Sequence, residues 1–110
     1  MPGVYEIVCK RTNRSYIGSA KVLNTRRKTH MLMLFENRHY NKALQADWNL
    51  YGAKQFEFRI IERIKCLPWM LSIRLVQVEQ KHIEGRTNLY NERAACQKTR
   101  KWWKYLLKWL

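Results

Sequence analysis

The fold of this chain is decided by residues 3–20, which read GVYEIVCKRTNRSYIGSA. Residues 3–10 are rich in β-branched and aromatic side chains, which favour extended strands. RTNRS at 11–15 is typical of a turn, and YIGSA at 16–20 predicts a second short strand. The stretch therefore predicts an antiparallel hairpin. Its register decides which side chains share a face, and the pattern alone does not fix that register.

Four further elements follow the hairpin, each with its own periodicity and end signals. In chain order we expect a helix at 22–35 capped by Asn24 or Thr25, a helix at 42–51 ended by Gly52, a strand at 56–64, and a helix at 69–84 that follows Pro68 and ends at Gly85. The resulting order, ββααβα, predicts a small α+β domain.

Charge is the strongest global signal in the composition. The 110 residues carry 22 Lys and Arg against 8 Asp and Glu, for a net charge of +14. Like charges repel in a compact domain, and a polyanion relieves that repulsion and releases counterions. Nucleic acid is the first candidate partner, and an anionic membrane surface is the second. The hydrophobic fraction of 46% excludes a chain that is disordered throughout.

The cysteines and the N-terminus bear on the cellular compartment. Cys9, Cys66 and Cys96 are odd in number and lack CxxC spacing, which argues against a disulfide framework and a zinc site. We expect reduced thiols in a cytoplasmic protein. The first residues show no signal-peptide pattern, and no stretch has the length of a transmembrane helix.

Two aromatic–glycine motifs bracket the hairpin. They are GVY at 3–5 and YIG at 16–18, with ten residues between them. Arg26 and His30 lie four residues apart on a predicted helix and so share a face. His39, Glu79 and Asn91 follow downstream. In this order and spacing the chain resembles the GIY-YIG nuclease family over roughly residues 3–92, with Val4 in place of the motif isoleucine.

The resemblance implies a three-stranded antiparallel sheet flanked by helices. It also implies hydrolysis of DNA with one divalent ion, Mg²⁺ or Mn²⁺, and no small-molecule cofactor. Carried over by position, the site consists of the motif tyrosines Tyr5 and Tyr16, the phosphate-binding Arg26, its helix neighbour His30, the metal carboxylate Glu79 and the supporting Asn91. Contacts with nucleic acid are expected from Gly18, Lys21, Arg27 and His39.

Elementary chemistry gives these residue types the same tasks. Arg26 can clamp a phosphate through two hydrogen bonds, and Glu79 can hold a hard divalent ion through oxygen. A tyrosine is a weak base because its reference pKa is about 10, but nearby positive charge lowers that value. We favour Tyr5 as the base, with neutral His30 accepting its proton. Tyr16 would then position phosphate or water, and Gly18 would admit the substrate to the backbone.

Structural interpretations compete with each of these roles. The tyrosines could be ordinary strand aromatics, His30 a core histidine, and Asn91 a turn residue. Glu79 could form a buried salt bridge with an arginine, or an ExxH pair with His82. The rival functions are a non-catalytic nucleic-acid-binding module of the same fold and, less favoured, a membrane-surface protein.

The C-terminal segment differs in composition from the nuclease-like domain at 1–92. In residues 93–110, three lysines fall on one helical stripe, and three tryptophans lie on the wider apolar surface. We expect a basic, amphipathic helix over 100–110 that packs on the domain or on a second copy, giving a homodimer. Stacking on nucleic acid and lying on anionic lipid are the alternatives.

Overall fold

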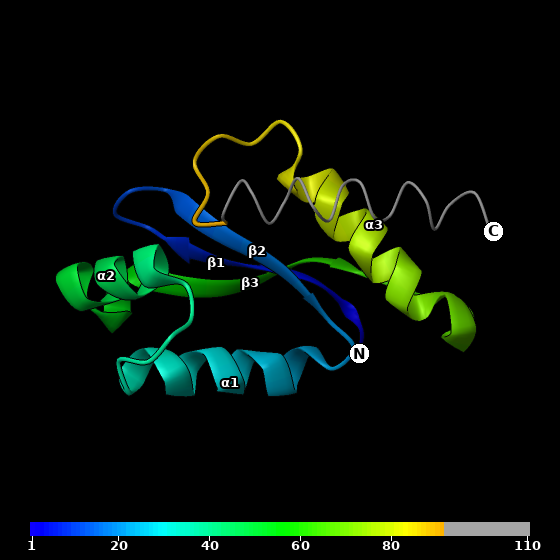
Figure 1. Ribbon diagram of the computed structural model, residues 1–110, viewed down its shortest axis with the longest axis horizontal. Helices are drawn as coiled ribbons and strands as arrows, with labels where there is room; N and C mark the ends of the chain where they lie inside the picture. The colour runs from blue at the N-terminus through cyan, green and yellow to red at the C-terminus, as the bar shows by residue number, and fades with distance from the viewer. Residues whose placement is uncertain (92–110) are drawn as a thin grey trace.

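The computed structural model describes residues 1–91 of the chain, which form a small α+β domain (Figure 1). In chain order the elements are β1 (Gly3–Cys9), β2 (Arg14–Ala20), α1 (Leu23–Phe35), α2 (Lys42–Tyr51), a 3₁₀ turn (Ala53–Gln55), β3 (Phe56–Arg63), a second 3₁₀ turn (Pro68–Met70) and α3 (Leu71–Ile83). The expected order ββααβα is confirmed. The helix predicted over 100–110 and its possible dimer contact lie outside the described residues.

The sheet has three antiparallel strands in the order β2-β1-β3. Tyr5 pairs with Gly18 across β1 and β2, and Ile7 pairs with Tyr16. Side chains alternate between the faces of a sheet, so this register puts both motif tyrosines on one face. The central strand β1 is covered on both sides by its neighbours, whereas β2 keeps one free edge.

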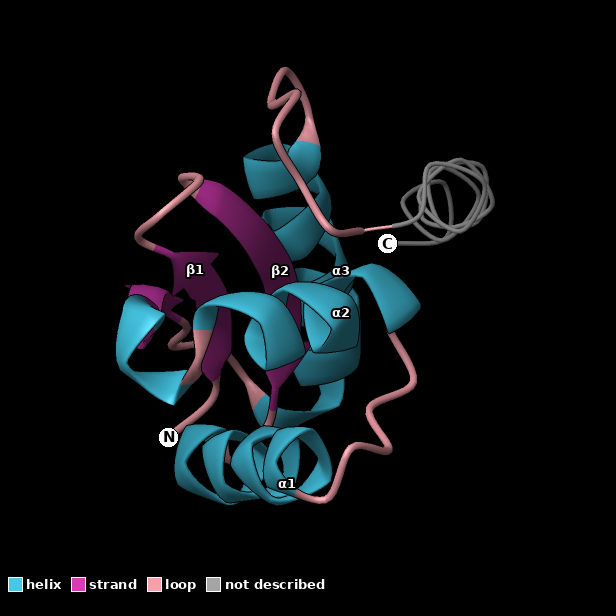
Figure 2. Cartoon of the chain, turned by 90° about the vertical axis from the view of Figure 1, so that its left-hand side faces the viewer, coloured by secondary structure: helices cyan, strands magenta, loops and turns pink. Residues whose placement is uncertain are grey.

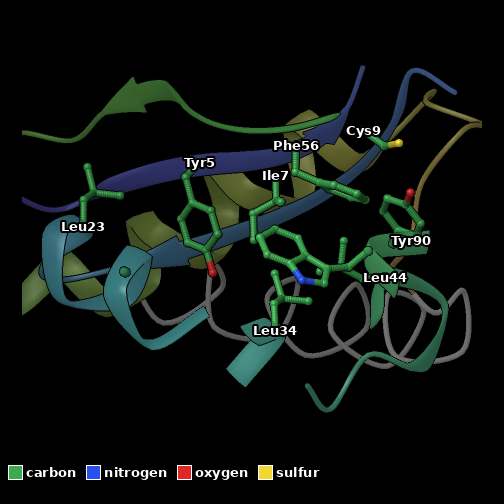
Figure 3. Close-up of a cluster of buried hydrophobic side chains, with 10 residues drawn as sticks. Tyr5, Ile7, Cys9, Leu23, Leu34, Leu44, Phe56 and Tyr90 are labelled. Atoms are coloured by element: carbon green, nitrogen blue, oxygen red, sulfur yellow. The ribbon is translucent and has the colours of Figure 1, made fainter. Parts of the chain in front are cut away.

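The sheet separates two apolar clusters. On one face, Tyr5, Ile7 and Phe56 pack against Leu34 of α1 and Leu44 of α2, as Figure 3 shows. On the other face lie the α3 residues Leu75 and Val78, together with Val4, Ile17 and Ile64. Figures 1 and 2 show α1 and α2 on one side of the sheet and α3 on the other. Burial of apolar surface on both faces stabilises the small sheet.

The helix ends follow the sequence in most places. Asn41 caps α2 through its side chain, which accepts a hydrogen bond from the Leu44 amide, and Gly52 follows that helix with a positive φ of 89°. The expected cap of α1 was wrong. Val22 precedes that helix without a side-chain cap, and Asn24 and Thr25 lie inside its first turn.

Residues 88–91 cover part of the free edge of β2. The Ser15 amide donates to the Asn88 carbonyl over 3.1 Å, and the Tyr90 amide donates to the Ser15 carbonyl over 2.7 Å. This is a single parallel bridge, not a fourth strand. Cys9 and Cys66 are free thiols. Within residues 1–91, no helix has the length and apolar character that a membrane crossing requires.

Candidate active site

Tyr5 is held in the interior by its neighbours on the sheet. Its side chain is 1% exposed, and its ring stacks on Phe58 of β3 at a centroid distance of 4.9 Å. Opposite it, a Cβ added to Gly18 would lie 2.4 Å from the Tyr5 hydroxyl oxygen. The missing side chain of Gly18 therefore makes room for the phenol, and the expected approach of substrate to its backbone stays a prediction.

Two histidines form a hydrogen-bonded chain that ends at the Tyr5 hydroxyl. Tyr5 Oη lies 2.6 Å from His30 Nε2, and His30 Nδ1 lies 2.8 Å from His39 Nε2. Both imidazoles are buried. Burial lowers the pKa of His30, and together with the neighbouring His39 and Arg26 it brings that pKa to about 3. His30 is therefore neutral at physiological pH.

His39 was expected to contact nucleic acid, and the structure places its side chain in the interior. The side chain is 1% exposed, and protein groups occupy both of its ring nitrogens. The sequence marked His39 as polar and close to the site, but only the packing of the connection between α1 and α2 determines that it points inward.

Tyr16 has a partner that sequence reasoning missed. Its hydroxyl lies 2.7 Å from that of Tyr40, whose ring stacks on His39 at 4.4 Å and is 54% exposed. Burial raises the pKa of Tyr16, and so does the hydrogen bond with Tyr40. Tyr40 follows His39 directly in the polar connection, and an aromatic residue beside a predicted site histidine was the available signal.

Glu79 reaches the site from the opposite face of the sheet. The Ser19 hydroxyl donates to its carboxylate over 2.9 Å. Burial raises the pKa of Glu79, while the Ser19 hydrogen bond and the Arg26 charge oppose that shift. Among residues 1–91, Glu79 has no ion pair, so the salt-bridge alternative finds no partner in this part of the chain. His82 lies 3.4 Å from Glu62 instead, so the ExxH alternative is not formed either.

Arg26 lines an open groove beside the end of β2. The groove has a volume of about 570 Å³ and is lined by Ser19, Ala20, Lys21, Val22, Thr25, Arg26, Thr29 and Leu75. Lys21 and Arg26 are exposed here, and Arg26 acts electrostatically on both Tyr5 and Glu79. Arg27 points elsewhere, with its guanidinium 6.0 Å from the centre of the Phe58 ring. The two neighbouring arginines therefore lie on different surfaces of the domain, Arg26 at the groove and Arg27 beside Phe58.

Asn91 braces the free edge of β2. Its side-chain oxygen accepts a hydrogen bond from the Ile17 amide over 2.9 Å, and its side-chain nitrogen donates to the Ile17 carbonyl over 2.7 Å. These two hydrogen bonds replace those that a neighbouring strand would make, so the amide and the carbonyl of Ile17 both have a partner. Asn91 thus supports the strand that carries Tyr16, Gly18 and Ser19, and both of its side-chain polar atoms are occupied by that task.

The site is therefore assembled around the edge strand β2. Tyr5, Tyr16 and His30 come from the face covered by α1, whereas Glu79 comes from α3 on the other face. Arg26 links the two sides through its charge. Glu79 places its carboxylate here, and residues 1–91 contain no group of three or more His, Cys, Asp or Glu side chains able to share a metal ion.

Tyrosine, histidine, arginine and glutamate side chains thus gather beside the edge strand of a three-stranded sheet. Residues 1–67 match the family described as GIY-YIG catalytic domain. The chain belongs to this GIY-YIG family. The expected three-stranded architecture is confirmed with it.

Two solved structures are similar to the chain. The catalytic domain of the homing endonuclease I-TevI is 30% identical, with a TM-score of 0.66, and the match covers 83% of this chain and 97% of that one. A point mutant of the catalytic domain of intron endonuclease I-TevI is 31% identical, with a TM-score of 0.64 and coverage of 82% and 91%. No curated protein matches the chain.

Proposed function

We propose that this protein is a metal-dependent endonuclease that hydrolyses DNA phosphodiester bonds. Its family and its likeness to the catalytic domain of a homing endonuclease support this proposal. The net charge of +14 suits a polyanionic substrate. The observation that carries the proposal is the meeting of Tyr5, Arg26 and Glu79 around one strand edge, next to an open groove.

Hydrolysis needs a base for the attacking water and positive charge for the phosphoryl oxygens. We assign the base to Tyr5, whose hydroxyl oxygen contacts His30 and lies in the field of Arg26. Arg26 is exposed at the groove and can place its planar guanidinium against a phosphate there. Tyr16, bonded to Tyr40, positions the phosphate or the water.

Glu79 fits the divalent ion that the family implies. A partly buried carboxylate is costly without a compensating cation, and its one described hydrogen bond comes from the neutral Ser19 hydroxyl. Mg²⁺ is often bound through one or two carboxylates while it keeps several waters. A bound Mg²⁺ or Mn²⁺ would supply positive charge to the phosphate. Ser19 donates to Oε2 of the carboxylate, and within residues 1–91 Oε1 could face the ion.

The test is a cleavage assay on supercoiled plasmid, with Mg²⁺, with Mn²⁺ and with EDTA. The wild type should nick or linearise the plasmid only when a divalent ion is present. Glu79→Gln should abolish cleavage while DNA binding persists, because binding depends on the overall charge. Glu57→Gln is the matched control, since this glutamate is exposed on β3 and pairs with Arg59.

The assay also separates the rival function. A wild type that binds plasmid and never cuts it with either ion would make the chain a nucleic-acid-binding module that keeps the fold. Cleavage by Glu79→Gln at the wild-type rate would remove Glu79 from the site. Equal losses in Glu79→Gln and Glu57→Gln would indicate a general loss of charge or folding instead of a metal site.

A further inference from the structure

A line of hydrogen bonds runs from the start of α2 to the Tyr5 hydroxyl. The Asn41 amide donates to His39 Nδ1 over 3.0 Å. His39 Nε2 then lies 2.8 Å from His30 Nδ1, and His30 Nε2 lies 2.6 Å from Tyr5 Oη. Each imidazole therefore has one partner at each nitrogen.

The first of these bonds fixes the direction of all the others. A backbone amide can only donate, so His39 Nδ1 must carry a lone pair. A neutral imidazole then bears its proton on Nε2, which donates to His30 Nδ1. The same reasoning puts the proton of His30 on Nε2, so that His30 donates to Tyr5 Oη.

Neither histidine can be cationic while this line is intact. A protonated imidazole has hydrogens on both nitrogens, and each Nδ1 here must accept a hydrogen bond. The environment agrees with the geometry, since burial lowers the pKa of both His39 and His30. The two neutral rings therefore form a hydrogen-bond chain with a single direction. His39 donates to His30, and His30 donates to the Tyr5 hydroxyl oxygen.

We propose that the Asn41 amide and His39 are positioning groups that lock His30 as a hydrogen-bond donor to Tyr5, so that His30 stabilises negative charge on the phenol oxygen and does not remove its proton. This inference rests on the proposed nuclease function. It reverses the expectation from sequence, in which His30 accepts the Tyr5 proton. The Tyr5 proton leaves to solvent before attack. The phenolate then takes one proton from the water as the oxygen of that water bonds to phosphorus, and it becomes a phenol again. The P–O bond to the leaving DNA oxygen breaks in the same step, and that oxygen takes a proton from solvent.

The phenolate needs such a donor in this position. Burial raises the pKa of Tyr5, and the nearby Tyr40 raises it further, while the Arg26 charge lowers it. A hydrogen bond that ends on an anion is roughly twice as strong as one between neutral groups. Donation from His30 therefore favours the phenolate at the oxygen where the proposed reaction requires it.

The turn that carries His39 is clamped at several points. Gln45 accepts a hydrogen bond from the His39 amide over 3.0 Å and donates to the Leu34 carbonyl over 3.0 Å, which ties the turn to α1. The Asn41 side chain caps α2 and also donates to the Tyr90 carbonyl over 2.9 Å. These contacts hold the Asn41 amide against His39, so the tautomer is set by backbone geometry.

The direct test is NMR on the full chain with ¹⁵N-labelled histidine, without DNA or metal. At neutral pH, long-range proton–nitrogen correlations should show His30 and His39 as Nε2–H tautomers with unprotonated Nδ1. His82, which is half-buried beside Glu62, serves as the internal reference. A cationic His30, or a His30 that carries its proton on Nδ1, would overturn the proposal. Because no cleavage is measured, this result is independent of the proposed function.

Two substitutions of His39 form a matched pair. The amide of His39→Gln can still donate to His30 Nδ1, whereas His39→Met has a similar length and no donor. We expect His39→Gln to keep the His30 tautomer and to cleave plasmid within a few-fold of the wild type. His39→Met should give mixed His30 tautomers and cleave about tenfold to a hundredfold more slowly. An unchanged His30 tautomer in His39→Met would contradict the proposal, as would equal cleavage losses in the two variants.

Discussion

The phenol of Tyr5 occupies the space that any side chain at position 18 would need. The two residues are paired across β1 and β2, and the Tyr5 hydroxyl would lie 2.4 Å from a Cβ on Gly18. The motif glycine and the motif tyrosine are therefore one packing unit. Their separation along the chain hides this relationship, which depends on the strand register.

Gly18→Ala should push Tyr5 out of its position. We expect a loss of about 1–3 kcal/mol in the free energy of unfolding, typical of overpacking, together with a loss of cleavage. Urea denaturation measures the first effect and plasmid nicking the second. In a Tyr5→Ala background the added methyl has room, so the same Gly18→Ala change should then cost little stability. Equal costs in both backgrounds would disprove the packing unit.

Tyr5→Phe removes only the hydroxyl that His30 contacts. If that oxygen accepts the proton of the attacking water, cleavage should slow by about 10²-fold or more. Tyr40→Phe is the comparison, since it removes an exposed hydroxyl bonded to Tyr16 and should have a smaller effect. Single-turnover cleavage rates decide the question. An active Tyr5→Phe beside an inactive Tyr16→Phe would exchange the roles of the two motif tyrosines.

The neighbouring arginines should respond differently to the same substitution. Arg26 lines the groove, whereas Arg27 lies by the Phe58 ring. Arg26→Lys keeps the charge but loses the planar fork, so we expect a loss of roughly tenfold to a hundredfold in cleavage rate. Arg27→Lys should stay within a few-fold. The two variants have the same net charge, so a comparable loss in both would mean that Arg26 has no special contact with phosphate.

Buried neutral histidine should make the fold sensitive to acid. Unfolded histidine binds a proton below about pH 6.5, whereas His30 in the fold resists protonation until about pH 3. Between these values the unfolded state binds more protons, so stability falls as the pH falls, by about 1.4 kcal/mol per pH unit for this group. Urea unfolding measured from pH 7 to pH 4 reports this slope.

The substitution His30→Gln isolates the contribution of His30 to the pH dependence of stability. The raised pKa of Glu79 acts in the opposite direction, because the folded state then binds the extra proton as the pH falls. The difference between wild type and His30→Gln removes this shared background. We expect a clearly shallower loss of stability in the variant. Parallel pH profiles would mean that His30 is protonated in the folded protein.

The local patterns of the sequence were sufficient for the elements of the fold. The helix expected at 42–51 is α2 (Lys42–Tyr51), and the expected strand at 56–64 differs from β3 by one residue. Periodicity and end signals are local properties, which explains this agreement. The predicted cap of α1 was wrong because the helix already begins at Leu23, so Asn24 and Thr25 lie inside its first turn.

The geometry of the site could not be read in the same way. Tyr5 and Tyr16 share a face only because of the register, which the sequence left open. Ser19 contacts Glu79 and Tyr40 contacts Tyr16, in both cases across a long separation in the sequence. Neither Ser19 nor Tyr40 is part of the GVY or YIG motif, so the motifs did not point to them. The direction of the histidine line depends on one backbone amide, a group that every residue except proline carries.

The bond pair between Asn91 and Ile17 has a practical consequence for protein engineering. Ile17 lies two residues before Ser19, which is about 7 Å along an extended strand, and Ser19 lines the groove and holds Glu79. A DNA-recognition module fused after residue 91 would thus be tethered beside the proposed cleavage site. A short linker would keep its effective concentration there high, and the length of that linker would set how far from the recognised sequence the DNA is cut.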